Sequence, residues 1–233
     1  MKVLKPFVHI ATPHNDIIEG KLTLDIFAAD LWQVVNNRAP TDYKDPVLFF
    51  RKTYLTKGLN NILNIAESRL KGRRGDSIIQ LQTPFGGGKT HTLIALYHKA
   101  KEWGAKVVVL DGTVFNPKES KLWEEIERQL TGKIELTKGD ISPGKEKLER
   151  ILLANSPVLI LMDEIAEYIT KASGIKVGDS NLASQTLAFL QELTGAVSAN
   201  DKAMLILTLP SSNLEYFDEK TEKIAHQIQK ILG

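Results

Sequence analysis

The sequence predicts an α/β fold in which helices cover both faces of a mostly parallel β-sheet, as a three-layer sandwich. Two observations support this prediction. From residue 77 onward, short apolar runs alternate with longer segments of helical periodicity. The short runs are predominantly apolar, which is typical of strands that are buried on both faces. The predicted strands are residues 78–81, 107–110, 158–162 and 204–208.

Helical spacing follows or separates these strands in five segments. Asn181 and Asn213 stand at the starts of two of them, where an N-cap side chain is expected. The segment "SGIKVGDSN" (173–181) has a loop composition, and we expect it to be mobile. The predicted helices are residues 89–103, 117–130, 144–155, 181–197 and 213–232.

Residues 1–76 differ in sequence pattern from the rest of the chain, because they show helical periodicity without the alternating apolar runs. "LTLDIFAADLWQVV" and "LTKGLNNILNIAESRL" have the pattern of two amphipathic helices, joined by a polar segment with two prolines. The stretch "KGRRGD" (71–76) has a turn composition. We therefore predict an N-terminal helical extension over residues 1–76 and an α/β core over residues 77–233.

Composition excludes several classes of protein. The 233 residues include 30 Lys and Arg against 28 Asp and Glu, so the net charge of +2 creates no strong field for nucleic acid or an anionic membrane. The absence of cysteine excludes disulfides and thiolate metal sites. No segment has the length of a signal-peptide core or a membrane span. We expect a cytoplasmic protein that does not enter a membrane.

A glycine-rich motif connects the first predicted strand to the first core helix. A phosphate-binding loop needs convergent backbone N–H groups, a Lys for the β and γ phosphates and a hydroxyl for Mg²⁺, all at a helix N-terminus. Thr83 occupies the position at which the usual pattern has its first glycine. The alternative is a glycine-rich turn without a ligand. The predicted cofactor-binding residues are Pro84, Phe85, Gly86, Gly87, Gly88, Lys89, Thr90 and His91.

Two adjacent carboxylates, Asp163 and Glu164, follow the apolar run "PVLILM". A strand-end Asp can hold the Mg²⁺ shell together with Thr90, and a following Glu can polarise an attacking water. The alternative is an ordinary helix N-cap followed by an acid in the first turn. Because the carboxylates follow the glycine-rich motif in the expected order, we predict Asp163 and Thr90 as metal ligands and Glu164 as the catalytic base.

Three further positions have two interpretations each. Thr208, at the end of the fourth predicted strand, and Ser211 are candidate groups for contact with the γ-phosphate and the attacking water, with Asn213 behind them; the alternative is a strand followed by an ordinary Pro-Ser turn. His91 lies either near the nucleotide or on the helix surface. The segment "DGT" (111–113) either shapes the pocket or forms a simple turn.

With these motifs in order, the chain resembles the additional-strand P-loop NTPases, and within them the AAA+ ATPases. "TPFGGGKTHT", "LMDEI" and "LILTLPSSN" match the Walker A, Walker B and sensor-1 positions. "LDIFAADLWQVV" and "DPVLFFRKTYLTKGL" resemble a domain-of-unknown-function family of AAA+-like ATPases, often encoded beside DNA methyltransferases in restriction or defence clusters. The resemblance implies ATP and Mg²⁺ as cofactors and Lys89 as a catalytic phosphate ligand. It also implies an adenine contact near Phe49, Phe50 or Tyr54, although aromatics beside an amphipathic helix are more often core residues.

The resemblance also implies features that the chain lacks. AAA+ proteins use an arginine finger and a sensor-2 arginine in a helical lid, but no arginine follows Arg150. A fifth core strand would also follow Gly233. We therefore expect the N-terminal part of a longer protein, without its lid; the alternative is a short variant that finds its arginine elsewhere. "PFVHIA" near the N-terminus is a hypothetical partner for the first core strand, whose edge would otherwise be open.

These observations predict ATP binding and Mg²⁺-dependent ATP hydrolysis, as the motor or switch of a DNA-directed defence or modification complex. Two alternatives stay open: a nucleotide-dependent interaction switch with little hydrolysis, and a fragment of a helicase-type motor. Both alternatives, like the leading prediction, allow protein partners in a DNA-modification or defence complex and allow an oligomer. The basic turn at residues 71–74 leaves direct DNA contact undecided.

Overall fold

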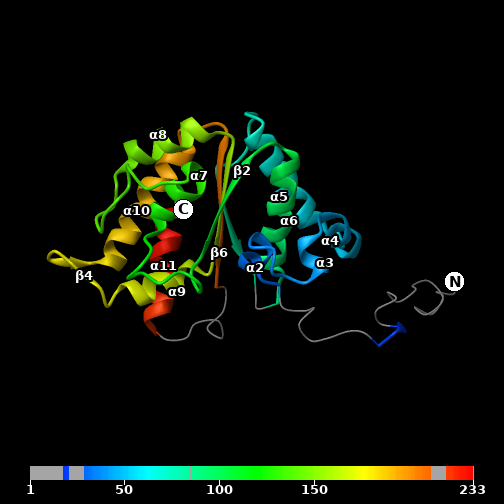
Figure 1. Ribbon diagram of the computed structural model, residues 1–233, viewed down its shortest axis with the longest axis horizontal. Coiled ribbons are helices and arrows are strands. Elements are labelled where there is room, and N and C mark those ends of the chain that lie inside the picture. Colours follow the sequence, from blue (N-terminus) through cyan, green and yellow to red (C-terminus); the bar gives the residue numbers. More distant parts are fainter. Residues whose placement is uncertain (1–17, 21–28, 84–85, 211–218, 233) are drawn as a thin grey trace.

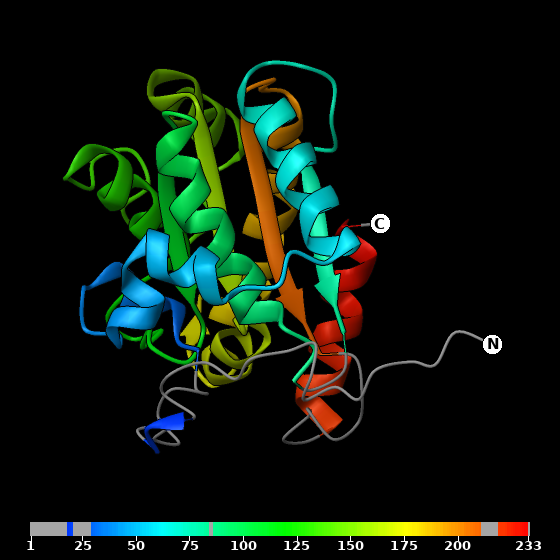
Figure 2. The same ribbon diagram turned by 90° about the vertical axis from the view of Figure 1, so that its right-hand side faces the viewer.

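The computed structural model describes residues 18–20, 29–83, 86–210 and 219–232. It contains a four-stranded parallel sheet in the order β1-β6-β3-β2, seen face-on in Figure 2. The four predicted strands are confirmed, and each is extended by one or two residues. Their bounds are β1 (Ile78–Gln82), β2 (Lys106–Asp111), β3 (Val158–Asp163) and β6 (Ala203–Leu209).

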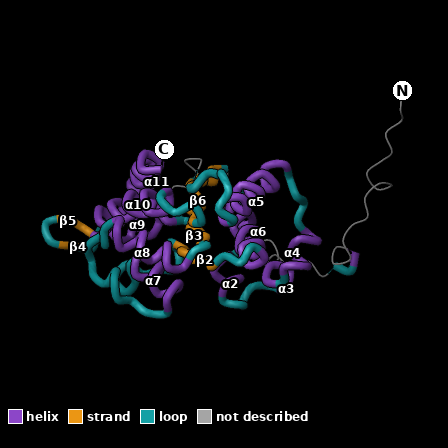
Figure 3. Tube along the Cα trace, turned by 90° about the horizontal axis from the view of Figure 1, so that it is seen from above, coloured by secondary structure: helices purple, strands orange, loops and turns teal. Residues whose placement is uncertain are grey.

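Helices cover both faces of this sheet, as Figures 1 and 3 show. One layer shares a hydrophobic cluster with side chains such as Val109, Leu161 and Ile206. It consists of α2 (Leu31–Val35), α3 (Thr41–Lys44), α4 (Pro46–Lys52), α5 (Lys57–Leu70) and α6 (Lys89–Glu102). The opposite layer consists of α7 (Leu122–Thr131), α8 (Lys145–Asn155), α9 (Ile165–Ala172), α10 (Leu182–Ser198) and α11 (Glu219–Leu232).

The structure corrects the expectation of a mobile loop at residues 173–181. This segment contains a short antiparallel hairpin of β4 (Lys176–Val177) and β5 (Ser180–Asn181). Gly178, with a φ of 56°, occupies its two-residue turn, where a residue without a Cβ adopts the left-handed region at little cost. As predicted, Asn181 caps α10 by accepting a hydrogen bond from the Ser184 N–H.

The polar segment predicted to join two helices contains helices of its own. Pro46 occupies the first turn of α4, and the Asp45 side chain caps this helix by accepting the Leu48 N–H at 2.9 Å. Proline is tolerated at this position because the first-turn N–H groups have no intrahelical partner. The prolines that indicated a linker therefore mark helix starts. Phe49 on α4 is buried, which confirms the core interpretation of this aromatic residue.

The two edges of the sheet differ. On the outer edge of β2, the Gln129 side-chain amide donates to the Val109 carbonyl and accepts the Val109 N–H, both at 2.9 Å. This amide occupies the backbone groups that another strand would use. Among the described residues, β1 pairs with β6 alone, and Ile78 and Ile79 are only partly buried. The segment 6–11, our hypothetical partner for β1, lies outside the described residues.

Arg69 attaches the last helix of the predicted extension to the sheet and to α10. Its buried guanidinium donates to the carbonyls of Ala203 at 3.1 Å, Val197 at 3.2 Å and Asn200 at 2.7 Å. Because the C-terminal carbonyls of a helix have no intrahelical donor, this side chain satisfies groups that would otherwise be buried without partners.

Arg69→Ala is therefore expected to lower the free energy of unfolding by about 2–4 kcal/mol, since it leaves several buried carbonyls without donors. Chemical denaturation monitored by circular dichroism measures this loss. Lys71→Ala is the control, because Lys71 forms an exposed ion pair with Glu67 on the same helix. Equal stability of the two variants would contradict the anchoring role of Arg69.

Candidate functional site

The glycine-rich segment forms a turn between the end of β1 and the start of α6. Gly86 and Gly88 have φ values of 75° and 79°, in the left-handed region that favours glycine. Gly88 is the N-cap of α6, and this residue has no side chain to accept a hydrogen bond from the first N–H groups of the helix. The turn therefore leaves the positive end of the helix dipole available to an anion. Pro84 and Phe85, two predicted cofactor-binding residues, lie outside the described residues.

Thr83 closes the entry to this turn in place of the expected glycine. Its carbonyl oxygen accepts a hydrogen bond of 2.9 Å from the Lys89 ammonium group. The Thr83 hydroxyl oxygen is buried and has no hydrogen-bond partner. This contact places the Lys89 ammonium group at the Thr83 carbonyl, where the glycine-rich turn begins.

Asp163, the last residue of β3, receives hydroxyl groups from two other elements. Thr90 on α6 donates to one carboxylate oxygen at 2.9 Å, and Thr208 on β6 donates to the other at 2.6 Å. Burial raises the pKa of Asp163, and the two hydroxyl hydrogen bonds oppose this rise. The structure thus brings together both predicted metal ligands, Thr90 and Asp163.

Glu164 does not act as a helix cap through its side chain. It occupies the N-cap position of α9 with φ 50° and ψ 34°, and its carboxylate accepts no capping hydrogen bond. The residue is exposed at the surface. Partial burial of the carboxyl group raises its pKa to about 7, and the charges of Asp163, Glu167 and Asp111 contribute to the rise. A carboxylate with this pKa is suited to accept a proton near neutral pH.

The raised pKa predicts a pH-dependent stability. Glu164 binds a proton more tightly in the folded state than in the unfolded state, where its pKa is close to 4.5. Its contribution is therefore complete below the unfolded pKa and is lost as the pH rises through about 7. In metal-free and nucleotide-free buffer, the unfolding free energy of the native chain should fall relative to Glu164→Gln across this window. A difference that is constant with pH would contradict this assignment.

The Thr208 hydroxyl makes two hydrogen bonds within the protein. Besides donating to Asp163, it accepts the backbone N–H of Glu164 at 3.1 Å. The side chain is buried with 2% exposure. Thr208 therefore orients both carboxylate residues, and this is the contact that the structure gives to the predicted catalytic hydroxyl. Ser211 and Asn213 lie outside the described residues.

His91 contacts the N-terminal helical layer. Its Nε2 lies 2.9 Å from the Thr53 hydroxyl, which donates its own proton to the Phe49 carbonyl. Thr53 must therefore accept, and His91 Nε2 carries a proton. The centroid of the Phe49 ring lies 4.5 Å from the centroid of the imidazole. Burial lowers the pKa of His91. The residue directly after Thr90 is thus neutral and packed against α4, whereas Tyr54 nearby is 85% exposed.

The segment at residues 111–113, which the sequence predicted as either a pocket-shaping segment or a simple turn, lies beside the acid pair. Asp111 ends β2 directly opposite Asp163 in the strand register, and its side chain is buried. One of its carboxylate oxygens accepts both the backbone N–H and the hydroxyl of Thr113, at 2.9 and 2.6 Å. The available signal was the "DGT" segment at a strand end, which is typical of turns in general.

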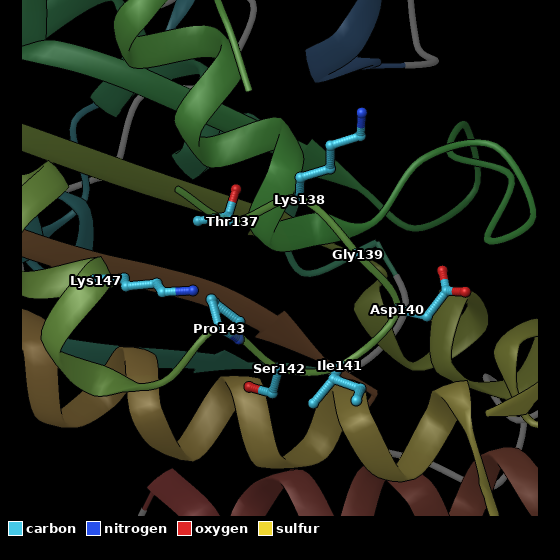
Figure 4. Close-up of a pocket in the computed structure, with 8 residues that line it drawn as sticks. All are labelled: Thr137, Lys138, Gly139, Asp140, Ile141, Ser142, Pro143 and Lys147. Carbon is cyan, nitrogen blue, oxygen red and sulfur yellow. The ribbon is translucent and has the colours of Figure 1, made fainter. Parts of the chain in front are cut away.

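A separate pocket lies on the segment between α7 and α8. Figure 4 shows the Lys147 amine directed toward this pocket and the side chains of Lys138 and Asp140 directed away from it. None of the predicted site residues lines it. Within the described part of the chain, no three acidic, histidine or cysteine side chains are placed to hold a metal ion.

The geometry defines an α/β protein with a parallel sheet. A glycine-rich turn and a pair of adjacent acids lie together at the carboxyl ends of its strands. Comparison with protein families gives matches over residues 12–131 and 121–232 to the DUF499 N-terminal domain. The chain belongs to this family. A search of curated proteins found no match. No helix in the described ranges has the length and apolar composition to cross a membrane.

Proposed function

We propose that this chain binds ATP and hydrolyses it in a Mg²⁺-dependent reaction, as a P-loop NTPase domain of AAA+ type. The observation that carries the proposal is the contact between Thr90, in the first turn of the helix after the glycine-rich turn, and Asp163, at the end of β3. A lysine, a metal-binding hydroxyl and an acid pair at one sheet edge are the groups that phosphoryl transfer requires.

Each of these residues has a role in the proposal. The backbone N–H groups from Gly86 to Thr90 and the Lys89 ammonium bind the β and γ phosphates. The Thr90 hydroxyl and the Asp163 carboxylate are the oxygen groups that would hold Mg²⁺. The bound cation would neutralise charge on the phosphates. Glu164 accepts a proton from the attacking water.

The position of β6 supports the AAA+ assignment. This strand lies between β1, which leads into the glycine-rich turn, and β3, which carries the acid pair. A place beside the strand that carries Asp163 is expected for the segment that resembles sensor 1. β6 also brings Thr208 beside Asp163, as expected for a residue in the sensor-1 position.

The test of the proposal is ATP turnover by the purified chain, measured as phosphate release with Mg²⁺ and with EDTA. Turnover that needs Mg²⁺ and is lost in Glu164→Gln supports the proposal. Failure to bind ATP with Mg²⁺ present would refute it. Competition by GTP measures base preference. Stimulation by duplex DNA would support a role in a DNA-directed defence or modification complex, and strand unwinding would favour a helicase-type motor.

A nucleotide-dependent interaction switch is the second candidate. It is favoured by the absence of any arginine after Arg150, because an arginine finger contributes about 10³–10⁵ in rate to related phosphoryl transfers. The switch predicts tight ATP binding without measurable turnover by this chain. Addition of a protein partner that supplies an arginine would then restore hydrolysis.

A further inference from the structure

We propose that Gly112, at the end of β2, is a positioning residue that holds Glu164 in its left-handed backbone conformation. The inference rests on the proposed function, in which Glu164 is the catalytic base. It assigns a role in that reaction to the turn at residues 111–113, on a neighbouring strand of the sheet.

The turn that contains Gly112 is fixed from both sides. The Asp111 carboxylate accepts the N–H and the hydroxyl of Thr113, which closes the turn around Gly112. The Lys171 ammonium on α9 lies 3.3 Å from the carbonyl oxygens of both Gly112 and Thr113. The Gly112 N–H donates to the Asp163 carbonyl at 2.9 Å, so the turn continues the ladder between β2 and β3.

Glu164 has a backbone conformation that needs such support. Its φ of 50° lies in the left-handed region, which is unfavourable for a residue with a side chain. The Glu164 N–H is held by the Thr208 hydroxyl, and its carbonyl accepts the Glu167 N–H at 3.0 Å in the first turn of α9. Both peptide groups of Glu164 are thus fixed, and with them the direction of the Cα–Cβ bond from which its carboxylate extends.

Gly112 packs directly against this constrained backbone. A Cβ atom at residue 112 would lie 2.1 Å from the Glu164 carbonyl oxygen and 2.7 Å from its carbonyl carbon. Neither distance is possible between non-bonded atoms, and both contacts are to backbone, which cannot rotate away. Any side chain at position 112 must therefore displace the Glu164 peptide or the turn itself.

Displacement of this peptide should affect hydrolysis more than nucleotide binding. The phosphate ligand Lys89 and the metal ligand Thr90 belong to α6, which does not include this contact. The Glu164 carboxylate, in contrast, would move with its backbone. A misplacement of about 1 Å in a catalytic group costs about 10²-fold in rate. We therefore expect Gly112→Ala to lower kcat by about 10–100-fold, with the Kd for Mg²⁺-ATP changed less than about threefold.

The experiment compares Gly112→Ala with Gly174→Ala in single-turnover hydrolysis, ATP-analogue binding and thermal unfolding. Gly174 is the matched control, because an added Cβ there lies 3.9 Å from its nearest neighbour and its φ is not in the left-handed region. We expect native hydrolysis in the control. Unchanged kcat in Gly112→Ala, or a loss of ATP binding equal to the loss of turnover, would overturn the inference.

The double variant with Glu164→Gln separates positioning from a general structural effect. If Gly112 acts through Glu164, its substitution should produce no further loss in the Glu164→Gln background. An equal loss in both backgrounds would overturn the inference.

Thr113→Val provides a second test if Gly112→Ala does not fold. It removes one hydrogen bond of the turn and retains Gly112, and we expect about a 3–10-fold loss of kcat with unchanged binding. Native turnover in Thr113→Val would then overturn the inference. Absence of Mg²⁺-dependent turnover in the native chain would instead show that the proposed function fails, and the inference with it.

Discussion

Glu164→Gln is expected to lower the rate of ATP hydrolysis by about 10²–10⁴-fold, the usual contribution of a positioned general base. The substitution keeps the size of the side chain and removes its ability to accept a proton. ATP affinity should stay within about threefold of the native value, because the phosphate ligands belong to α6 and the preceding turn. Single-turnover hydrolysis and equilibrium binding of an ATP analogue measure the two quantities.

Glu167→Gln is the matched control for this prediction. Glu167 lies in the first turn of α9 and contacts Lys171 at 3.6 Å, so the same chemical change occurs one helical turn from the site. Its charge contributes to the raised pKa of Glu164, and we expect only a small change in turnover. A similar loss of rate in both variants would show that negative charge near the site matters and that Glu164 is not a specific base.

Lys89→Ala is expected to weaken ATP binding by about 10²-fold, because each charge-assisted hydrogen bond to a phosphate contributes about 1.5–3 kcal/mol. In the structure described here the ammonium group donates to the Thr83 carbonyl at 2.9 Å, within the turn that would surround the phosphates. Titration with Mg²⁺-ATP, followed by calorimetry, measures the affinity.

Lys101→Ala is the control for the lysine substitution. Lys101 lies in the last turn of the same helix and is exposed, so its removal should leave ATP affinity unchanged. Circular dichroism of both variants checks that the fold is retained. Native affinity in Lys89→Ala would refute the assignment of the glycine-rich turn as a phosphate site.

The contact of His91 with Thr53 gives the N-terminal helices a direct connection to this site. His91 follows Thr90, the proposed metal ligand, in sequence, and its imidazole packs on Phe49 of α4. A shift of the first turn of α6 would therefore displace the contacts of His91 with Thr53 and with Phe49 of α4. The predicted extension is thus part of one helical layer of the sandwich, and the boundary proposed at residue 76 stays a prediction about domain organisation.

The sequence alone determined the local features of this protein. Apolar runs predicted β1, β2, β3 and β6 within one or two residues, and β3 and β6 are buried at every position, as expected of strands that are covered on both faces. The glycines, Lys89 and Thr90 are a contiguous motif whose geometry depends on the backbone of a few residues. The acid pair was visible because it ends such a strand.

Only the tertiary structure decided how these local features meet. The register of β2 against β3 places Gly112 against Glu164, although 52 residues separate them in the chain, as their numbers show. The hydroxyl of Thr208 joins Asp163 and Glu164 because β6 lies between β1 and β3. Strand order and long-range contacts depend on the packing of the whole chain, and no short sequence pattern encodes them. The residues proposed to bind ATP and Mg²⁺ were therefore predictable from motifs, whereas the residues proposed to position them depend on the fold.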